Sequence, residues 1–256
     1  MKIIKQNKLS INTSISEITL GTMRFLEKSL MPNEVTDIID TCFDNGIDTH
    51  HSSSEYESYN LYTEGLAKSK NIQKIKHIAK LAAPHFGESK FSSERLITGV
   101  DNYLKTLKKD RIEVLQWLVR STPINDIDRL KVINENTNEI NEVLGTLKQE
   151  GKIETVYSFP YSVVFAEEVL KKISEVDGII SYLNILELDY VDIAHKNKFI
   201  SIRPLASGKI LNKPNSIGLK KVLKFPLSFE NSLSTVISLN SKANIETLIN
   251  ALSNHS

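Results

Sequence analysis

The stretch IKHIAKLAAPHFGESKFSSERLITGVDNYLKTLKKDRIEVLQWLV, residues 75–119, contains the unit from which the fold is built. Apolar runs at Ile75–Lys80 and Ile112–Val119 predict two strands. Between them, Ser92-Ser93-Glu94 is typical of a helix start, and apolar residues then recur at helical spacing up to Leu107. A strand, a helix and a strand in this order predict two parallel strands joined by a right-handed crossover.

The same alternation extends in both directions along the chain, after a predicted N-terminal β-hairpin. The eight predicted strands are Ile18–Met23, Ile47–His50, Ile75–Lys80, Ile112–Val119, Ile153–Tyr157, Gly178–Tyr182, Phe199–Arg203 and Thr235–Ser238. The predicted helices after the first two strands are Asn33–Asp44 and Leu61–Ala67, and a long one ends at Gln149 before Gly151. The last four are Val163–Ile173, Ile185–Ala194, Ile217–Leu223 and Ala243–Leu252.

Eight strand–helix units predict a single α/β domain, a (β/α)8 TIM barrel covering residues 1–256. The length of 256 residues suits one such barrel. An open doubly wound sheet is the competing arrangement. Two observations favour the barrel: no Gly-rich dinucleotide fingerprint follows the first strand, and no change of composition marks a second domain.

The composition indicates a globular protein without a strong charge preference. Lys and Arg number 32 against 31 acidic residues, so the net charge of +1 favours neither nucleic acid nor an anionic membrane as a partner. The N-terminus lacks the apolar run of a signal peptide, and no stretch approaches the ~20 apolar residues that span a bilayer, so we expect a cytoplasmic protein. The lone cysteine, Cys42, is expected to be a buried, inert thiol rather than a redox group. The oligomeric state is left open by the sequence.

In a (β/α)8 barrel, the residues that follow each strand form the active site. Polar or otherwise distinctive strings occur at these positions. They are Gly21-Thr22-Met23-Arg24-Phe25, His50-His51-Ser52-Ser53-Ser54-Glu55-Tyr56, Ile78-Ala79-Lys80, Gln116-Trp117-Leu118-Val119-Arg120, Arg203-Pro204-Leu205-Ala206-Ser207-Gly208 and Ser241-Lys242.

Five segments, in order, resemble motifs of the aldo-keto reductases, and the resemblance extends over roughly Thr19 to Lys242. Leu20 to Phe25 resembles the family's opening strand and loop, and Asn45 to Tyr56 resembles its second strand, which leads to a tyrosine. Ile78-Ala79-Lys80 resembles the end of the third strand. The two other motifs are Gly151-Lys152-Ile153 and Pro204-Leu205-Ala206-Ser207-Gly208.

The resemblance implies reduction of a carbonyl by a nicotinamide cofactor, NADPH or NADH, on a small-molecule substrate. Tyr56 takes the place of the family's proton-donating tyrosine and Lys80 that of the lysine that tunes it. The pair is physically reasonable, because a phenol with a pKa of about 10 needs a nearby cation to exchange protons near neutral pH.

Two other matches fail. The position of the family's aspartate holds His51, which becomes the third predicted catalytic residue, and the position of its histidine holds Leu118. Without its aspartate, a buried Lys80 tends towards neutrality. Glu55 or Asp48 are the alternatives that could restore the missing negative charge, although strand alternation points Asp48 to the face opposite His51.

The cofactor positions that the resemblance implies are partly kept. They are Gly21, Thr22, Met23, Asn184, Arg203, Leu205, Ser241 and Lys242, the last two as phosphate contacts at a helix start. The family's Ser-Asn pair that holds the nicotinamide amide aligns with Phe159 and Pro160, its later Gln aligns with Ile180, and the segment after Gly208 is shorter than the family's cofactor-covering loops.

His50, Trp117, Leu118 and Arg120 are predicted to bind the substrate. A metal site made of His50, His51 and His85 is disfavoured, since adjacent strand residues face opposite ways, and we expect no metal. Three functions stay open. They are a reductase of small polar metabolites such as sugar derivatives, a cofactor-free acid/base isomerase or lyase in the same pocket, and a barrel without catalysis that serves as a binding partner.

Overall fold

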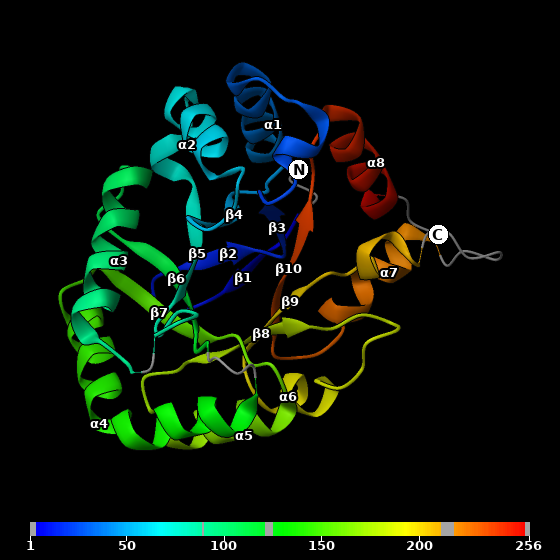
Figure 1. Cartoon of the computed structure of the whole chain (residues 1–256). Helices are drawn as coiled ribbons and strands as arrows, with labels where there is room; N and C mark the ends of the chain where they lie inside the picture. The colour runs from blue at the N-terminus through cyan, green and yellow to red at the C-terminus, as the bar shows by residue number, and fades with distance from the viewer. Residues whose placement is uncertain (1–3, 89, 121–124, 211–217, 254–256) are drawn as a thin grey trace.

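The computed structural model describes residues 4–88, 90–120, 125–210 and 218–253, and within them eight parallel strands close into a barrel inside a ring of helices (Figure 1). The barrel strands are β3 (Ile18–Gly21), β4 (Thr49–Ser53), β5 (Lys76–Ala82), β6 (Ile112–Leu118), β7 (Ile153–Ser158), β8 (Gly178–Tyr182), β9 (Phe199–Ile202) and β10 (Ser232–Ser238). The predicted (β/α)8 barrel is therefore confirmed.

A helix follows each barrel strand. These helices are α1 (Pro32–Asp44), α2 (Tyr59–Lys68), α3 (Ser93–Leu107), α4 (Asp126–Gln149), α5 (Val163–Lys172), α6 (Val191–Lys196), α7 (Leu219–Leu227) and α8 (Lys242–Ser253). Three short 3-10 helices lie in loops of the described part, at Phe25–Lys28, Ile72–Lys74 and Ala206–Gly208. None of the described helices is both long enough and apolar enough to cross a membrane.

A hairpin closes the end of the barrel at which the strands begin. It is made of β1 (Gln6–Lys8) and β2 (Ser14–Ser16), which pair antiparallel, as predicted. Leu9 and Ile15 are fully buried in the apolar cluster inside the barrel, and the Lys198 ammonium donates to the Leu9 carbonyl. Since this end is filled, ligands reach the barrel interior from the opposite end.

The barrel closes along the pairing of β3 with β10. A side chain at Gly21 would bring its Cβ within 3.1 Å of Val236 Cγ1 and 3.3 Å of the Ile237 carbonyl oxygen, so glycine permits the strands to approach here. The hydroxyls of Thr19 and Ser234 are 2.7 Å apart across the same boundary, and both are fully buried. Any larger residue at position 21 would push its neighbours on β10 away by a few tenths of an ångström, so Gly21 has a role in strand packing, whatever else it contacts.

The boundaries of two predicted elements differ from the structure. The second strand begins two residues later than predicted and extends to Ser53, because its buried polar residues pair in register with β5. The helix predicted from Ile185 begins only at Val191. The Asn184 side chain accepts hydrogen bonds from the backbone N–H groups of Leu186 and Glu187, and this local turn competes with a helix.

Two further predictions concern a buried cysteine and a segment that the structure does not describe. Cys42 of α1 is fully buried, and burial raises the pKa of its thiol, as expected for an inert group. Residues 211–217, in the segment predicted to cover the cofactor and including the predicted start of a helix at Ile217, lie outside the described residues.

Candidate active site

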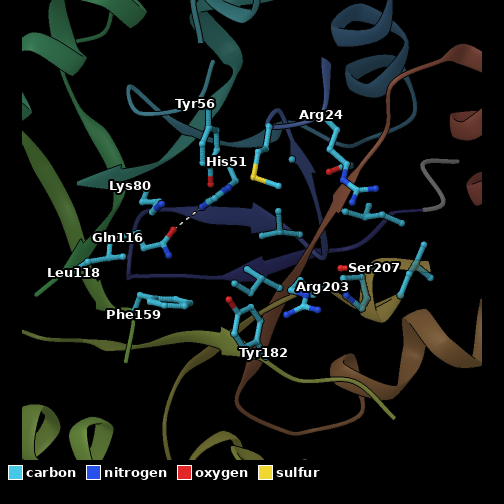
Figure 2. Close-up of a pocket in the computed structure, with 18 of the residues that line it drawn as sticks. Arg24, His51, Tyr56, Lys80, Gln116, Leu118, Phe159, Tyr182, Arg203 and Ser207 are labelled. Carbon is cyan, nitrogen blue, oxygen red and sulfur yellow. Dashed lines mark hydrogen bonds between the residues drawn. The ribbon is translucent and has the colours of Figure 1, made fainter. Parts of the chain in front are cut away.

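A pocket of about 660 Å³ opens at the carboxyl ends of the barrel strands (Figure 2). Its wall combines polar side chains from β4, β5 and β6 with aromatic side chains near the ends of β7 and β8. The residues of this wall are His51, Tyr56, Lys80, Gln116, Leu118, Arg120, Phe159, Tyr161 and Tyr182. The opposite wall contains Gly21, Met23, Arg24, Ile202 to Leu205, Ser207, Gly208 and Val236 to Ser238.

Tyr56 and Lys80 lie together on one wall of this pocket. The Lys80 ammonium is 5.2 Å from the centroid of the Tyr56 ring, and Figure 2 shows both side chains pointing into the cavity. Lys80 points inward from β5, whereas Tyr56 is held in the loop after β4 by its backbone N–H, which donates to the Ser53 carbonyl. The pairing on which the sequence-based hypothesis depends is therefore present in the structure.

Burial dominates the titration of both groups. It raises the pKa of the Tyr56 phenol above its usual value of about 10, and nearby Tyr103 and Glu55 act in the same direction. It lowers the pKa of Lys80, and the carboxylate of Glu55 opposes this shift. Tyr56 is accordingly a neutral phenol at neutral pH, the form from which a proton can be donated.

Glu55, not Asp48, supplies a carboxylate to Lys80. Its Oε2 lies 3.6 Å from the Lys80 ammonium, while Asp48 forms a 3.0 Å ion pair with Lys76 at the other end of the strands. The negative charge has thus moved from the strand position, where the family places it, to the loop that carries Tyr56.

His51 is a neutral side chain fixed by Gln116. Its Nε2 lies 2.5 Å from Gln116 Oε1, and because an amide oxygen can only accept, Nε2 carries the hydrogen. Burial is the main cause that lowers the pKa of His51 to about 4. The centroids of the His51 and Tyr56 rings are 6.1 Å apart. Gln116 was not predicted as a site residue, although its inward register matches that of Leu118.

Two predicted substrate residues face away from the pocket. His50 Nδ1 lies 3.0 Å from the Tyr62 hydroxyl, between the barrel and α2, and Trp117 donates its indole N–H to the Ala83 carbonyl at 2.9 Å. Both are fully buried. Strand alternation explains their placement, since their neighbours His51 and Leu118 face inward. His50 and Trp117 therefore do not line this pocket, whereas Leu118 and Arg120 do.

Four predicted cofactor residues line the pocket: Gly21, Met23, Arg203 and Leu205. Arg203 lies with its guanidinium 4.8 Å from the centroid of the Tyr182 ring and pairs with Glu187 at 3.5 Å. Sequence reasoning did not assign Tyr182. Its signal was its position at the carboxyl end of a predicted strand.

The other four predicted cofactor residues lie outside the lining and have partners of their own. Thr22 donates its hydroxyl to the His51 carbonyl, and Asn184 donates its amide to the Arg203 carbonyl. Ser241 accepts from the Asn244 backbone at the start of α8, and Lys242 pairs with Asp37 at 2.9 Å on the surface. This arrangement does not support the prediction that these four residues bind cofactor.

The donors that a nicotinamide carboxamide needs are also missing from β7. Phe159 occupies the position that corresponds to the family's amide-binding side chains, and it packs with Ala82 and Leu118 and edge-on to Tyr182. Arg24, Arg203 and Ser207 line the opposite wall and have hydrogen-bond donors that the side chain of Phe159 lacks.

The three histidines considered as metal ligands are separated by their surroundings. His50 faces α2, His51 faces Gln116, and His85 lies beside Glu55. Among the described residues, no group of three His, Cys, Asp or Glu side chains is arranged to hold a metal ion.

Comparison with known proteins gives one matching family and several solved structures with a similar fold. The family model described as the aldo/keto reductase family matches residues 17–218. Among solved structures, the holo form of aldo-keto reductase AKR11C1 from Bacillus halodurans matches with a TM-score of 0.75 and 16% identity, over 98% of this chain and 91% of that one. The Pseudomonas aeruginosa protein PA4992, assigned as an aldo-keto reductase, matches with a TM-score of 0.72 and 21% identity, over 97% and 96%. No curated protein sequence matches the chain.

Proposed function

The chain belongs to the aldo/keto reductase family of oxidoreductases, and on that premise we propose that it reduces the carbonyl group of a small polar metabolite with NADPH or NADH. The observation that carries the proposal is the placement of Tyr56 and Lys80 on one wall of the pocket, with the Lys80 ammonium 5.2 Å from the phenol ring. A phenol and an ammonium in this arrangement form a proton donor and the cation that stabilises its conjugate base.

Tyr56 donates the proton to the carbonyl oxygen. Its raised pKa keeps the phenol protonated until the oxygen develops negative charge, and the Lys80 ammonium then stabilises the phenolate that remains. Glu55 favours the charged form of Lys80, because its carboxylate opposes the lowering of the Lys80 pKa by burial. Leu118 cannot donate a hydrogen bond to the substrate, so His51, held by Gln116, is the polar side chain beside the phenol.

A bound nicotinamide supplies the hydride in this reaction. Gly21, Met23, Arg203 and Leu205 line the wall against which we expect the cofactor to bind, and Arg24, Arg203 and Ser207 offer donors for its phosphates. Because Phe159 replaces the amide donors, we expect weaker cofactor binding than a complete set of contacts provides.

Cofactor titration tests this function. Purified protein is titrated with NADPH and with NADH, and the fluorescence of the dihydronicotinamide is followed. Saturable binding of either nucleotide, together with its oxidation in the presence of small aldehydes and ketones, is the expected result. Absence of binding up to millimolar nucleotide rules the reductase out.

Because Phe159 replaces the donors for a nicotinamide amide, a second candidate function is a cofactor-free acid/base reaction such as an isomerisation or an elimination. In this case, Lys80, whose pKa is lowered by burial, acts as a base, and the protonated Tyr56 acts as an acid. Turnover of a carbonyl metabolite without nucleotide, lost on Lys80→Ala, is the expected result. Activity that survives this change unaltered excludes the mechanism.

A further inference from the structure

The wall of the pocket has an excess of positive charge. Arg24, Lys80, Arg120 and Arg203 all line it, and no Asp or Glu is found among the described residues of the lining. The carboxylates that pair with these cations lie outside the lining. The number of carboxylates paired with each cation therefore decides which part of the wall has positive charge left for a ligand.

On the wall opposite Tyr56, each cation has a carboxylate of its own. Arg24 pairs with Glu27 at 3.2 Å, and Arg203 pairs with Glu187 at 3.5 Å. The two arginine side chains are 43% and 39% exposed, so water screens what charge remains.

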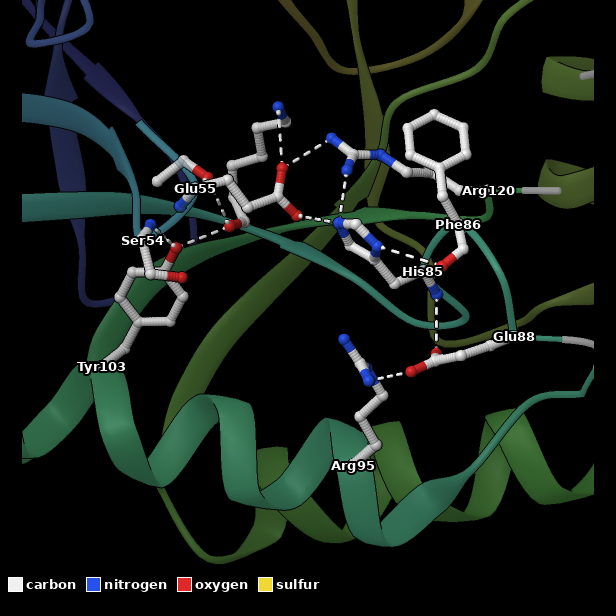
Figure 3. Close-up of polar contacts among 10 residues, drawn as sticks. Ser54, Glu55, His85, Phe86, Glu88, Arg95, Tyr103 and Arg120 are labelled. Atoms are coloured by element: carbon white, nitrogen blue, oxygen red, sulfur yellow. Dashed lines mark hydrogen bonds and ion pairs between the residues drawn. The ribbon is translucent and has the colours of Figure 1, made fainter. Parts of the chain in front are cut away.

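At the Tyr56 end, two cations share one carboxylate. Glu55 Oε2 lies 3.6 Å from the Lys80 ammonium and 2.6 Å from Arg120 Nη2. Figure 3 shows the Glu55 carboxylate between Arg120 and His85. Together with Lys80, these residues form what we call the Glu55 cluster: Glu55, Lys80, His85 and Arg120. Lys80 and Arg120 are only 17% and 11% exposed, so water screens their charges less than those of the opposite wall.

His85 does not cancel the excess charge. Arg120 has only donors, so His85 Nε2 is the acceptor in their 2.7 Å contact. The second ring nitrogen, Nδ1, lies 3.5 Å from the Phe86 carbonyl, which fits the tautomer with hydrogen on Nδ1. Glu55 and His85 are then close neighbours and not an ion pair. With Lys80 protonated, the Glu55 cluster carries one positive charge in excess.

The loop that carries Glu55 is anchored, which keeps this charge distribution in place. Tyr103 of α3 accepts a hydrogen bond from the Ser54 N–H at 2.6 Å (Figure 3). It donates one to the Lys80 carbonyl, also at 2.6 Å. Glu88, which accepts from the His85 N–H and pairs with Arg95, holds the other side of the cluster.

We propose that the substrate is an oxo acid, whose carboxylate binds to Lys80 and Arg120 while its carbonyl group faces the Tyr56 hydroxyl. One excess positive charge matches the single charge of a carboxylate better than the roughly −1.5 to −2 of a phosphate monoester. The planar guanidinium of Arg120 keeps hydrogens on its terminal nitrogens for a planar acid group. This inference deepens the proposed reductase and rests on it for the carbonyl, but not for the anion.

A matched pair of aldehydes tests the substrate class. 4-Formylbenzoate and 4-formylbenzamide have the same shape and the same carbonyl group and differ in charge. For the unaltered protein, we expect kcat/KM to be at least ~30-fold higher for the acid, in line with a charge-assisted hydrogen bond. Arg120→Gln should reduce this ratio to near one, and Arg120→Lys should keep part of it. In the control Arg203→Gln, the ratio is expected to stay the same even if cofactor binding weakens.

Binding without turnover separates this inference from the proposed function. Isothermal titration with benzoate, benzamide and inorganic phosphate requires no nucleotide, and we expect benzoate to bind best and to lose affinity in Arg120→Gln. If nucleotide oxidation is absent but benzoate binds in this way, the reductase fails and the acid subsite stands. Equal affinity for benzoate and benzamide, an acid preference that Arg120→Gln leaves unchanged, or tighter binding of phosphate overturns the inference.

Discussion

The two faces of β4 and β5 carry similar polar side chains in opposite surroundings. On the inner face, His51 and Lys80 have polar partners in Gln116 and Glu55 and border the pocket. On the outer face, His50 and His77 lie near the Tyr62 hydroxyl under α2, at 3.0 and 3.5 Å, and their Nε2 atoms have no partner within the described residues.

The same types of residue therefore have different roles on the two faces of the strands. The inner groups keep donors that a ligand can reach, whereas the outer groups are closed off from solvent and ligand by packing. Changes on the inner face should therefore alter activity and leave stability nearly unchanged, and changes on the outer face should do the reverse.

The largest effect is expected from a pair of tyrosine changes. Tyr56→Phe removes the proton donor and should lower kcat about 10³-fold, within the range for general acid catalysis, with little change in the free energy of unfolding. Tyr62→Phe should leave kcat intact and destabilise the fold by about 1–3 kcal/mol, because two buried imidazole nitrogens lose their partner. Carbonyl reduction and urea unfolding of both variants measure this. Loss of activity in Tyr62→Phe with full activity in Tyr56→Phe contradicts the assignment of the two faces.

Acid should lower the stability of the fold through His50 on the outer face. Burial lowers the pKa of His50 to about 3, from about 6.5 in the unfolded chain, so the unfolded state takes up the proton first as the pH falls. Stability is therefore complete above pH 6.5 and decreases as the pH falls towards 3. Between pH 7 and pH 5, His50 alone should cost about 2 kcal/mol.

Urea unfolding at pH 7 and pH 5 checks this expectation. His50→Gln serves as the comparison: it lacks the titrating ring, so it should lose less stability between the two pH values even if it is less stable at both. An identical loss in the two proteins shows that other groups are responsible.

Glu55→Gln should give a moderate effect on the inner face. The Glu55 carboxylate raises the pKa of Lys80, so its removal should lower that pKa further and move the alkaline loss of activity to lower pH. We expect kcat on the alkaline side of the pH profile to fall relative to the unaltered protein, because a larger fraction of Lys80 is then neutral. The matched control is Glu88→Gln, in the neighbouring network but without contact to Lys80, and its pH profile of kcat should keep its position. A shift of Glu55→Gln to higher pH contradicts the role of Glu55.

The smallest effect is expected at the altered cofactor wall. Phe159→Asn supplies an amide at the position where the family has one, and one net hydrogen bond of about 1 kcal/mol should tighten NADPH binding about fivefold. Phe159→Ala opens the same space without a donor and is the control. Equal affinities in the two variants show that the nicotinamide does not bind beside this residue.

The barrel fold could be predicted from the sequence, because short apolar runs alternate with amphipathic ones along the chain. The assignment of Lys80 to the site came from the resemblance of Ile78-Ala79-Lys80 to a family motif. The extent of β4 did not follow, since Ser52 and Ser53 look like part of a polar loop until their pairing with Ala79 and Lys80 of β5 is known.

Site residues could be predicted where a motif places them at the end of a strand, but not where their role depends on a partner elsewhere in the fold. Asn184 matched a family motif, but its side chain is used by a local turn that the motif does not reveal. The contact between His51 and Gln116 joins residues 65 positions apart and depends on the register of three strands. The position of Glu55 depends on a loop conformation that Tyr103 fixes from α3, which no local pattern contains.

The pairing of β3 with β10 has a consequence for synthesis of the protein on the ribosome. These neighbours are the first and last strands of the barrel, so a growing chain can close it only after β10 has emerged. Until then, β3 and β9 present open sheet edges, which are sites of intermolecular association. We therefore expect nascent chains stalled before Ser232 to need a chaperone, and any stop codon upstream of β10 to yield an insoluble product.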